Sequence, residues 1–411
     1  MKRLIRQGTI LAGTLTITPF TPVTAAAQEL TPVASVLGIQ DQEYEPRPVN
    51  LLGGNVFVGA TAQLEYDSNI FAQEFATTDD LKVIVQPYAL LRKQAGAFDI
   101  TGLARLNARK FFQNASEDAV GGDAEAGVRW QPTDADLVAF QAAYRHIVED
   151  RGEPEGRTDP RLGPRELDAL EGEVELAHEW SRLGVSVRGL GARLRYDDQS
   201  DRARDLDRYA ALLRLSYRVS GTLRGFGEAT ISRRDFRLTA IGGQDRDATT
   251  YSGRMGIAVD PGGFIRGEAA VGLYRFTPDS PQFDSRNGFS AQASLIYQPR
   301  QRLAFTLDGF VGDVATYRTG AQSRQDTRVQ FGLQQELFHN LRWQASAVYR
   351  RSAYFGTGIR ERTYAGIGEI EYLASRRVRF GILVRAAERN SSAPLEDFER
   401  ARAALQLKVS L

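Results

Sequence analysis

Charged side chains at every second position are the first candidates for chemistry in this sequence. One acidic row consists of Glu171, Glu173, Glu175 and Glu179. Basic rows contain Arg214, Arg218, Arg328, Arg377, Arg379, Arg385, Arg400 and Arg402. Fixed charges on one face of an enclosed wall either pair with one another or flank a water-filled path for polar solutes. The alternative is a structural role, in which the rows keep the wall rigid and hydrated without selecting a solute.

Patterns for catalysis and metal binding are weak by comparison. His146, His178 and His339 are the only histidines, and none has a second histidine or a carboxylate at a metal-ligand spacing. The chain has no cysteine and no nucleophile motif, which argues against thiol chemistry and Cys-ligated zinc. Acids between Asp197 and Asp207 could hold a divalent cation, but the arginines among them favour a solvated loop. The sequence therefore predicts no enzyme, no metal and no cofactor, although residues that converge only in space stay open.

Alternation with a period of two identifies the elements that carry these charges. In the last segment Leu405, Leu407 and Val409 share one face, while Gln406 and Lys408 lie on the other. A two-residue period indicates a strand rather than a helix. A chain that stops on such a strand leaves an apolar face uncovered and an edge unpaired. A barrel closed in lipid removes both problems, whereas a large soluble all-β protein is the alternative.

The same pattern repeats along most of the chain. Strand-like segments of about 10 to 15 residues are joined alternately by short turns and long polar loops, and their number is about eighteen. An even number places both ends of the barrel on the side of the short turns, which faces the periplasm in bacterial outer-membrane barrels. Tryptophan, tyrosine and phenylalanine gather near strand ends, as expected for aromatic girdles. The predicted fold is therefore all-β: a single transmembrane antiparallel up-and-down β-barrel.

Composition and the first residues agree with export from the cytoplasm. Hydrophobic residues make up 42% and charged residues 25%, and the formal net charge of +1 indicates no nucleic acid partner. Residues 1–27 have a basic start, an apolar middle and an Ala-rich end, which predicts a cleaved signal peptide. Residues 28–54 carry several prolines and predict a periplasmic lead-in segment. Residues 55–411 then form the barrel, and the predicted location is the outer membrane.

The first predicted hairpin contains the most specific motif. Tyr66, Asp67, Ser68, Asn69, Ile70 and Phe71 end the first strand, and the next strand carries Pro87. Together with the segment 127–132, this resembles the outer-membrane β-barrel porins found with exopolysaccharide and capsule biosynthesis clusters. The resemblance implies a role in exopolysaccharide or capsule export, and it makes Tyr66, Asp67, Asn69 and Phe71 candidate binding residues. Without the family, the same residues are explained as an Asx-type turn that starts a loop.

These observations lead to one functional hypothesis and its alternatives. We expect a hydrated, charged lumen that lets a polar polymer cross the outer membrane. A general porin for small solutes and a closed structural barrel are the alternatives. The loop Glu153–Arg165, rich in glycine, proline and charge, is the candidate plug. Expected partners are outer-membrane lipid and lipopolysaccharide, the barrel-assembly machinery, polysaccharide and periplasmic export components.

Overall fold

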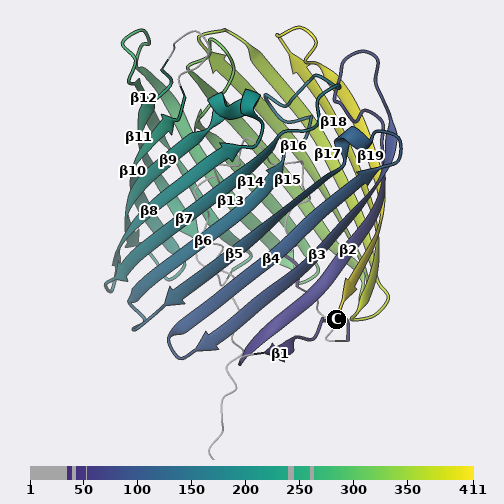
Figure 1. Cartoon of the computed structure of the whole chain (residues 1–411). Coiled ribbons are helices and arrows are strands. Elements are labelled where there is room, and N and C mark those ends of the chain that lie inside the picture. Colours follow the sequence, from purple (N-terminus) through teal and green to yellow (C-terminus); the bar gives the residue numbers. More distant parts are fainter. Residues whose placement is uncertain (1–34, 39–42, 52, 239–244, 260–262) are drawn as a thin grey trace, which may run out of the picture.

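The protein folds as a closed barrel of eighteen antiparallel strands, β2 to β19, in a computed structural model (Figure 1). The structure describes residues 35–38, 43–51, 53–238, 245–259 and 263–411. The strands are β2 (Gly54–Asp67), β3 (Asp80–Ala95), β4 (Phe98–Phe111), β5 (Ala119–Trp130), β6 (Asp136–Val148), β7 (Glu166–Glu179), β8 (Leu183–Tyr196), β9 (Leu206–Arg218), β10 (Leu223–Phe236), β11 (Ala248–Val259), β12 (Ile265–Pro278), β13 (Arg286–Arg300), β14 (Leu303–Val314), β15 (Ser323–Phe338), β16 (Leu341–Phe355), β17 (Arg360–Leu373), β18 (Val378–Ser391) and β19 (Phe398–Ser410). The predicted fold class and strand number are confirmed.

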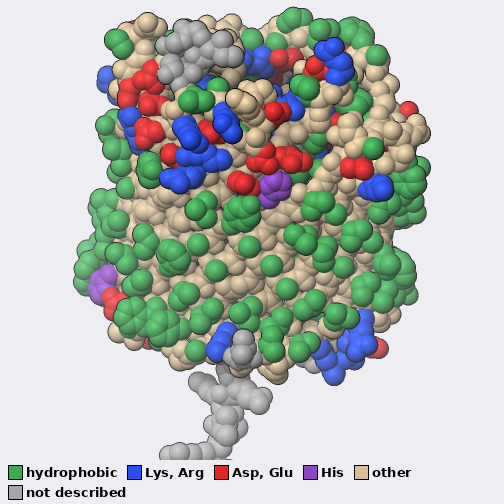
Figure 2. Space-filling model, in the orientation of Figure 1, with side chains coloured by type: hydrophobic (Ala, Val, Ile, Leu, Met, Phe, Trp, Pro, Cys, Tyr) green, Lys and Arg blue, Asp and Glu red, His purple; other side chains and the backbone are tan. Residues whose placement is uncertain are grey.

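Alternation places apolar residues outside and polar residues inside, as a barrel in lipid requires. Closure joins the last strand to the first, with Leu405 of β19 opposite Leu64 of β2. Leu405 is 60% exposed on the outer face, while its neighbour Gln406 is 7% exposed on the inner face. Figure 2 shows apolar side chains over most of the outer wall, with charged side chains gathered in a band near one rim. The terminal strand therefore closes the sheet as its two-residue period predicted.

The connections divide the barrel into a turn end and a loop end. Short turns lie at the turn end together with the short strand β1 (Val49–Leu51), which pairs with β2, and the C-terminus (Figure 1). Gly96, with φ of +61°, allows the tight turn between β3 and β4. The connection between β4 and β5 is short, because β5 begins at Ala119. The segments 237–247 and 260–263, which connect β10 to β11 and β11 to β12, lie partly outside the described residues.

Packed apolar clusters sit at the loop end. The largest contains Leu167, Leu194, Tyr196 and Leu206 from β7, β8 and β9. It lies where the 3-10 helix η3 (Gln199–Arg204) connects β8 to β9. A second 3-10 helix, η2 (Ala115–Glu117), follows β4. These clusters therefore support the loops, while a smaller one, Ile367, Leu383 and Ala404, lies among polar groups midway along β17, β18 and β19.

No helix among the described residues is long and apolar enough to cross a membrane.

A short piece of the lead-in segment enters the turn end of the barrel. The backbone N–H of Val36 donates to Gln334 Oε1 at 2.7 Å, and Arg342 Nη2 donates to the carbonyl of Gly38 at 3.0 Å. Gln334 and Arg342 belong to the inner faces of β15 and β16. The predicted signal peptide, residues 1–27, lies outside the described residues.

Candidate functional site

The β6–β7 loop, residues 149–165, folds into the barrel instead of projecting from it. Gly152, Pro154, Gly156, Pro160, Gly163 and Pro164 break any regular element in this stretch. A Cβ on Gly156 would lie 2.6 Å from the carbonyl oxygen of Arg151, so this position requires glycine. Several charged residues of the loop are buried, among them Arg151, Glu153 and Arg157. The sequence composition thus yields a compact inserted loop, which we call the lumen loop.

The lumen loop reaches the wall opposite its own strands. β7 and β16 stand nine places apart in the ring of eighteen strands, which makes them opposite. Glu153 Oε2 lies 2.9 Å from Arg350 Nη1 of β16. Glu155 Oε1 lies 3.1 Å from Arg324 Nη1 of β15 and also accepts from Thr316 Oγ1 at 2.7 Å. The loop therefore spans the lumen from one wall to the other.

Two further contacts fix the first part of the loop to the end of the chain. Asp150 Oδ1 lies 2.8 Å from Arg400 Nη1, and Asp150 Oδ2 lies 3.5 Å from Arg402 Nη1, both in β19. Arg389 of β18 donates to the carbonyl of Gly152. Each of these side chains is buried or nearly so. A buried pair that loses one partner leaves an uncompensated charge, so this arrangement strongly disfavours release of the loop.

Contacts with the two 3-10 helices, η2 and η3, also hold the lumen loop in place. Arg151 donates to both carboxylate oxygens of Glu117 in η2, from Nε at 3.1 Å and from Nη2 at 2.5 Å. Its guanidinium also lies 5.4 Å from the ring of Phe71. Arg157 forms an ion pair with Asp201 of η3. Anchors on both walls make the lumen loop part of the folded barrel rather than a mobile surface loop.

Asp150 and Glu153 of the loop have opposite electrostatic environments. Burial opposes ionisation of Asp150, but Arg400 and Arg402 outweigh burial and hold the pKa of Asp150 well below its usual range. Burial raises the pKa of Glu153 to about 7, although Arg350 favours the charged form. Asp150 adds to this rise, whereas Arg389 and Arg328 oppose it. Asp150 is therefore a permanently charged anchor, while Glu153 titrates close to neutral pH.

Little space remains between the loop and the wall of β15–β19. The cavity there measures about 30 Å³, and Arg328, Arg350, Arg400 and Arg402 contribute to its lining. This volume holds about one or two water molecules. By contrast, the inward side chain of Arg105 on β4, which pairs with Asp123 at 2.9 Å, is 53% exposed. The lumen loop therefore packs closely against the β15–β19 side of the inner wall.

The charged rows singled out in the sequence line the inner wall, and most of them pair with neighbouring strands. Glu171 pairs with Arg145, and Glu173 and Glu175 lie 3.1 and 3.3 Å from Arg188. Further pairs join Glu179 to Arg218, Arg214 to Glu228 and Glu268, and Arg385 to Glu65. Arg328 lies at the cavity, Arg379 belongs to the inner face of β18, and Arg400 and Arg402 bind the loop.

Arg377 is a correction to this set. It was expected to share the inner face with Arg379, but it lies in the turn before β18 and its side chain is exposed. The alternation that pointed to it continues one residue beyond the hydrogen-bonded strand, where the chain already turns. Sequence reasoning also missed the anchors Arg324 and Arg350, because nothing near them in the chain marks them as partners of the loop.

The Tyr66–Phe71 motif supports the lumen loop and lies where β2 pairs with β19 to close the barrel, a junction that we call the seam. Asp67, fully buried, pairs with Lys82 at 3.1 Å and with Arg400 at 2.7 Å. The Asn69 amide donates to the carbonyls of Gln73 and Glu399 at 2.8 and 2.9 Å. Phe71 is buried beside the loop, whereas Tyr66 faces outward. These contacts are structural, so the motif joins β2, β19 and the loop into one unit.

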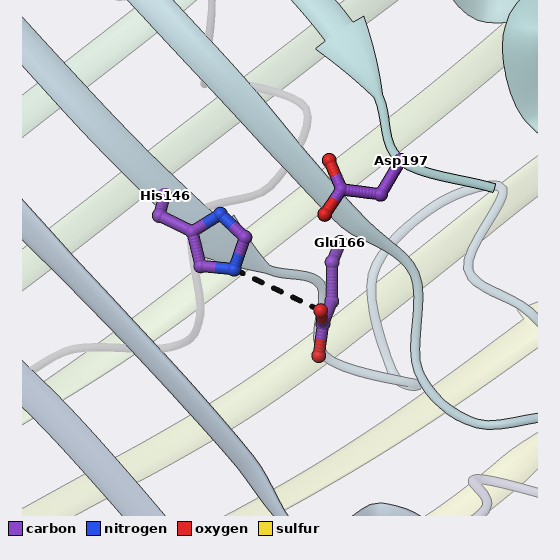
Figure 3. A group of neighbouring side chains, drawn as sticks. All are labelled: His146, Glu166 and Asp197. Atoms are coloured by element: carbon purple, nitrogen blue, oxygen red, sulfur yellow. Dashed lines mark ion pairs between the residues drawn. The ribbon is translucent and has the colours of Figure 1, made fainter.

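One group of side chains on the outer wall could hold a cation. His146 of β6, Glu166 of β7 and Asp197 after β8 offer ligand atoms within 4.8 Å of one another (Figure 3). His146 Nε2 lies 3.7 Å from Glu166 Oε2, and His146 Nδ1 lies 2.9 Å from Asp168 Oδ1. The three residues come from different strands, so their spacing in the sequence could not reveal the group. The group faces away from the lumen, and it takes no part in the lumen loop.

Comparison with known families agrees with this architecture. The family model described as Putative beta-barrel porin 2 matches residues 54–411, which is the whole barrel. The chain belongs to this family. Membership assigns it to outer-membrane porin-type barrels and to channels rather than enzymes. A search of the curated proteins finds no match to this chain.

Solved structures with a similar fold include several outer-membrane proteins. OccK11 (OpdR) of Pseudomonas aeruginosa is 13% identical, with a TM-score of 0.44 over 90% of this chain and 99% of that one. OpdK of Pseudomonas aeruginosa, solved with vanillate, is 11% identical, with a TM-score of 0.45 over 87% and 99%. The copper transporter OprC is 12% identical, with a TM-score of 0.44 over 92% and 86%.

Proposed function

We propose that this porin-family barrel is a narrowed outer-membrane channel for small hydrophilic solutes. The observation that carries the proposal is the lumen loop, which Glu153 and Glu155 anchor to the wall opposite its own strands and Asp150 anchors to β19. A loop held in this way divides the lumen and limits the size of the solute. Charged side chains on the inner wall hydrate the remaining path. A lumen of eighteen strands without such a loop would be wide enough for an aqueous channel.

Export of a polysaccharide is the second candidate. The motif that carries the resemblance to polysaccharide-associated barrels, Tyr66–Phe71, is coupled to the lumen loop. Asp67 and Asp150 bind the same guanidinium, that of Arg400, and Phe71 lies beside Arg151. A polymer would need the loop to leave the lumen, so this role requires a conformational change that passage of a small solute does not.

A liposome-swelling experiment tests the first proposal. The mature chain, refolded into vesicles, is compared with a triple variant in which Asp150, Glu153 and Glu155 are changed to Ala. We expect the original chain to admit monosaccharides and exclude larger oligosaccharides, and the variant to admit both. Exclusion of every sugar by both proteins would overturn the channel proposal in favour of a closed structural barrel.

Polysaccharide export is tested in cells. A strain that lacks the chain is complemented with the intact gene or with the triple variant, and surface polysaccharide is measured. Loss of surface polymer that the intact gene restores would support export. Unchanged polymer in the deletion strain would leave the small-solute channel as the function.

A further inference from the structure

A cluster of arginines lies on the inner faces of β9, β10 and β13 near the loop end of the barrel. Arg208 of β9 and Arg234 of β10 are directly opposite each other in the strand register. Like charges at such positions destabilise a sheet, unless another group compensates them. Arg286 of β13 lies close to Arg234, because both bind the same carboxylate, that of Asp313. Two guanidinium groups therefore share one buried acid, and Arg208 lies beside one of them.

Several hydroxyl groups lie beside these arginines and suit a polar ligand. Arg208 Nε lies 3.4 Å from Ser232 Oγ, and Arg286 donates to Ser323 Oγ at 2.9 Å and to the Tyr274 hydroxyl at 3.1 Å. Glu171 of β7 acts on Arg208 electrostatically, but Glu171 is already paired with Arg145. Arg234 and Arg286 thus share the carboxylate of Asp313, while their other contacts here are hydroxyl groups.

Donor atoms remain available within the cluster. In the described part of the chain, Arg234 Nη1 and Arg286 Nε are buried and have no hydrogen-bond partner. The side chain of Arg234 is 9% exposed and that of Arg286 is 21% exposed, so the cluster is desolvated but reachable. Aromatic rings back the guanidinium planes: Phe276 lies 5.2 Å from Arg234, and Phe355 lies 3.2 Å from Arg286. The rings fix these planes and leave their edges for an acceptor.

We propose that Arg208, Arg234 and Arg286 form a binding site for the carboxylate of an anionic sugar or organic acid inside the lumen. A carboxylate matches the fork of donors that a guanidinium presents, and its charge offsets the repulsion between Arg208 and Arg234. The inference rests on the proposed channel function, and it names the class of solute that the channel selects. The same chemistry fits a free sugar acid or an acidic unit of a polymer.

Isothermal titration calorimetry on the refolded mature chain tests the site. Sodium glucuronate is the probe, and glucose at the same concentration is the uncharged comparison. We expect saturable binding of glucuronate and none of glucose. Arg208→Gln should weaken glucuronate binding about tenfold or more, because it removes a charge-assisted hydrogen bond while both ion pairs of Asp313 remain. This substitution also relieves the repulsion with Arg234, so the variant is expected to fold.

Arg105→Gln is the matched control, because it removes one inward positive charge at a distant place on the wall. It should change glucuronate binding less than twofold. Equal weakening by both variants, or equal binding of glucuronate and glucose, would overturn the proposed site. A glucuronate-containing oligosaccharide distinguishes the sources: tighter binding than the monomer points to an acidic polymer, and equal or weaker binding points to a free sugar acid.

Conductance of the same preparation separates this inference from the channel function. A barrel that conducts but does not bind glucuronate refutes the site alone. A barrel that never conducts refutes the channel, while calorimetry still decides whether the carboxylate site exists.

Discussion

Arg400 of the last strand binds Asp150 of the lumen loop at 2.8 Å, and the same guanidinium binds Asp67 at the end of the first barrel strand. One buried arginine thus holds both the closure of the barrel and the loop that divides its lumen. The two tasks are coupled, because a displaced loop would take the Asp150 carboxylate away from the guanidinium that also binds Asp67. Loop position and seam stability are therefore expected to change together.

Removal of the Asp150 carboxylate, one of the loop's acidic anchors, should widen the channel. Asp150→Ala leaves Arg400 paired with Asp67 and frees the start of the loop, so we expect single-channel conductance to rise several-fold. Asp159→Ala is the control within the same loop, because the ion pair of Asp159 in the described part of the chain is with the exposed Arg161. Equal conductance of the Asp150→Ala protein and the original protein in planar bilayers would contradict the role of the loop as a constriction.

The seam motif should contribute more to stability than to binding. Asn69 is fully buried and its side-chain amide makes three hydrogen bonds, to Gln73 and Glu399. Asn69→Ala should lower the free energy of unfolding by about 2 kcal/mol, because buried backbone groups lose their partners. Tyr66→Phe removes only one exposed hydrogen bond and should cost less than about 0.5 kcal/mol. Urea unfolding in vesicles, followed by tryptophan fluorescence, measures both; similar values would argue against the seam role.

Loop docking should depend on pH through Glu153. Its pKa is raised to about 7 in the docked loop, mainly by burial, from an ordinary value near 4.5. The docked state therefore binds the proton more tightly, and docking weakens as pH rises from about 4.5 to about 7. Asp150 stays charged over this range and adds no dependence. We expect conductance to increase between pH 5 and pH 7 and then to level off.

Glu153→Gln provides the check on this assignment. The amide cannot ionise, so the variant should keep the low conductance of pH 5 at every pH from 5 to 8. A pH dependence that persists unchanged in the variant would assign the titration to another group.

Glu173 and Glu175 of β7 should influence the ion selectivity of the channel together with their partner, Arg188. Glu173 and Glu175 both pair with Arg188, so changing both to Gln removes two negative charges from the inner wall beside this arginine. The ratio of chloride to potassium permeability should then rise about two-fold to ten-fold. Glu388→Gln, on the outer face, should leave the ratio unchanged. A reversal potential in a salt gradient gives the ratio, and an unaltered value in the double variant would exclude this row from the ion path.

The absence of cysteine allows a direct test of orientation. The loop end should lie outside the cell, so Phe75→Cys, which is 66% exposed in the β2–β3 loop, should react with a membrane-impermeant maleimide on whole cells. Gly221→Cys, in the β9–β10 turn where no atom lies within 4 Å of an added Cβ, should react only after lysis. Labelling in the reverse order would invert the predicted topology.

Much of the barrel was predictable because strand alternation is local. The faces of β19, the strand number and most turn positions follow from which residues are two apart in the chain. The inward position of Glu171, Glu173 and Glu175 follows for the same reason. Arg377 was misplaced because a two-residue period does not show where hydrogen bonding stops. The glycines and prolines between Glu153 and Arg165 indicated an inserted loop, because such a segment cannot continue a strand.

The sequence by itself determined an outward apolar face, an inward polar face and a closing strand, since each depends only on neighbours along the chain. The tertiary structure alone decided which charges meet. Asp150 and Arg400 are 250 positions apart, and they meet because the ring of eighteen strands brings β6 and β19 to one lumen. Arg208 faces Arg234 because of the register of two paired strands. Closure and register are global properties, so the pairing of charges, and with it the path for a solute, could not be inferred from local pattern.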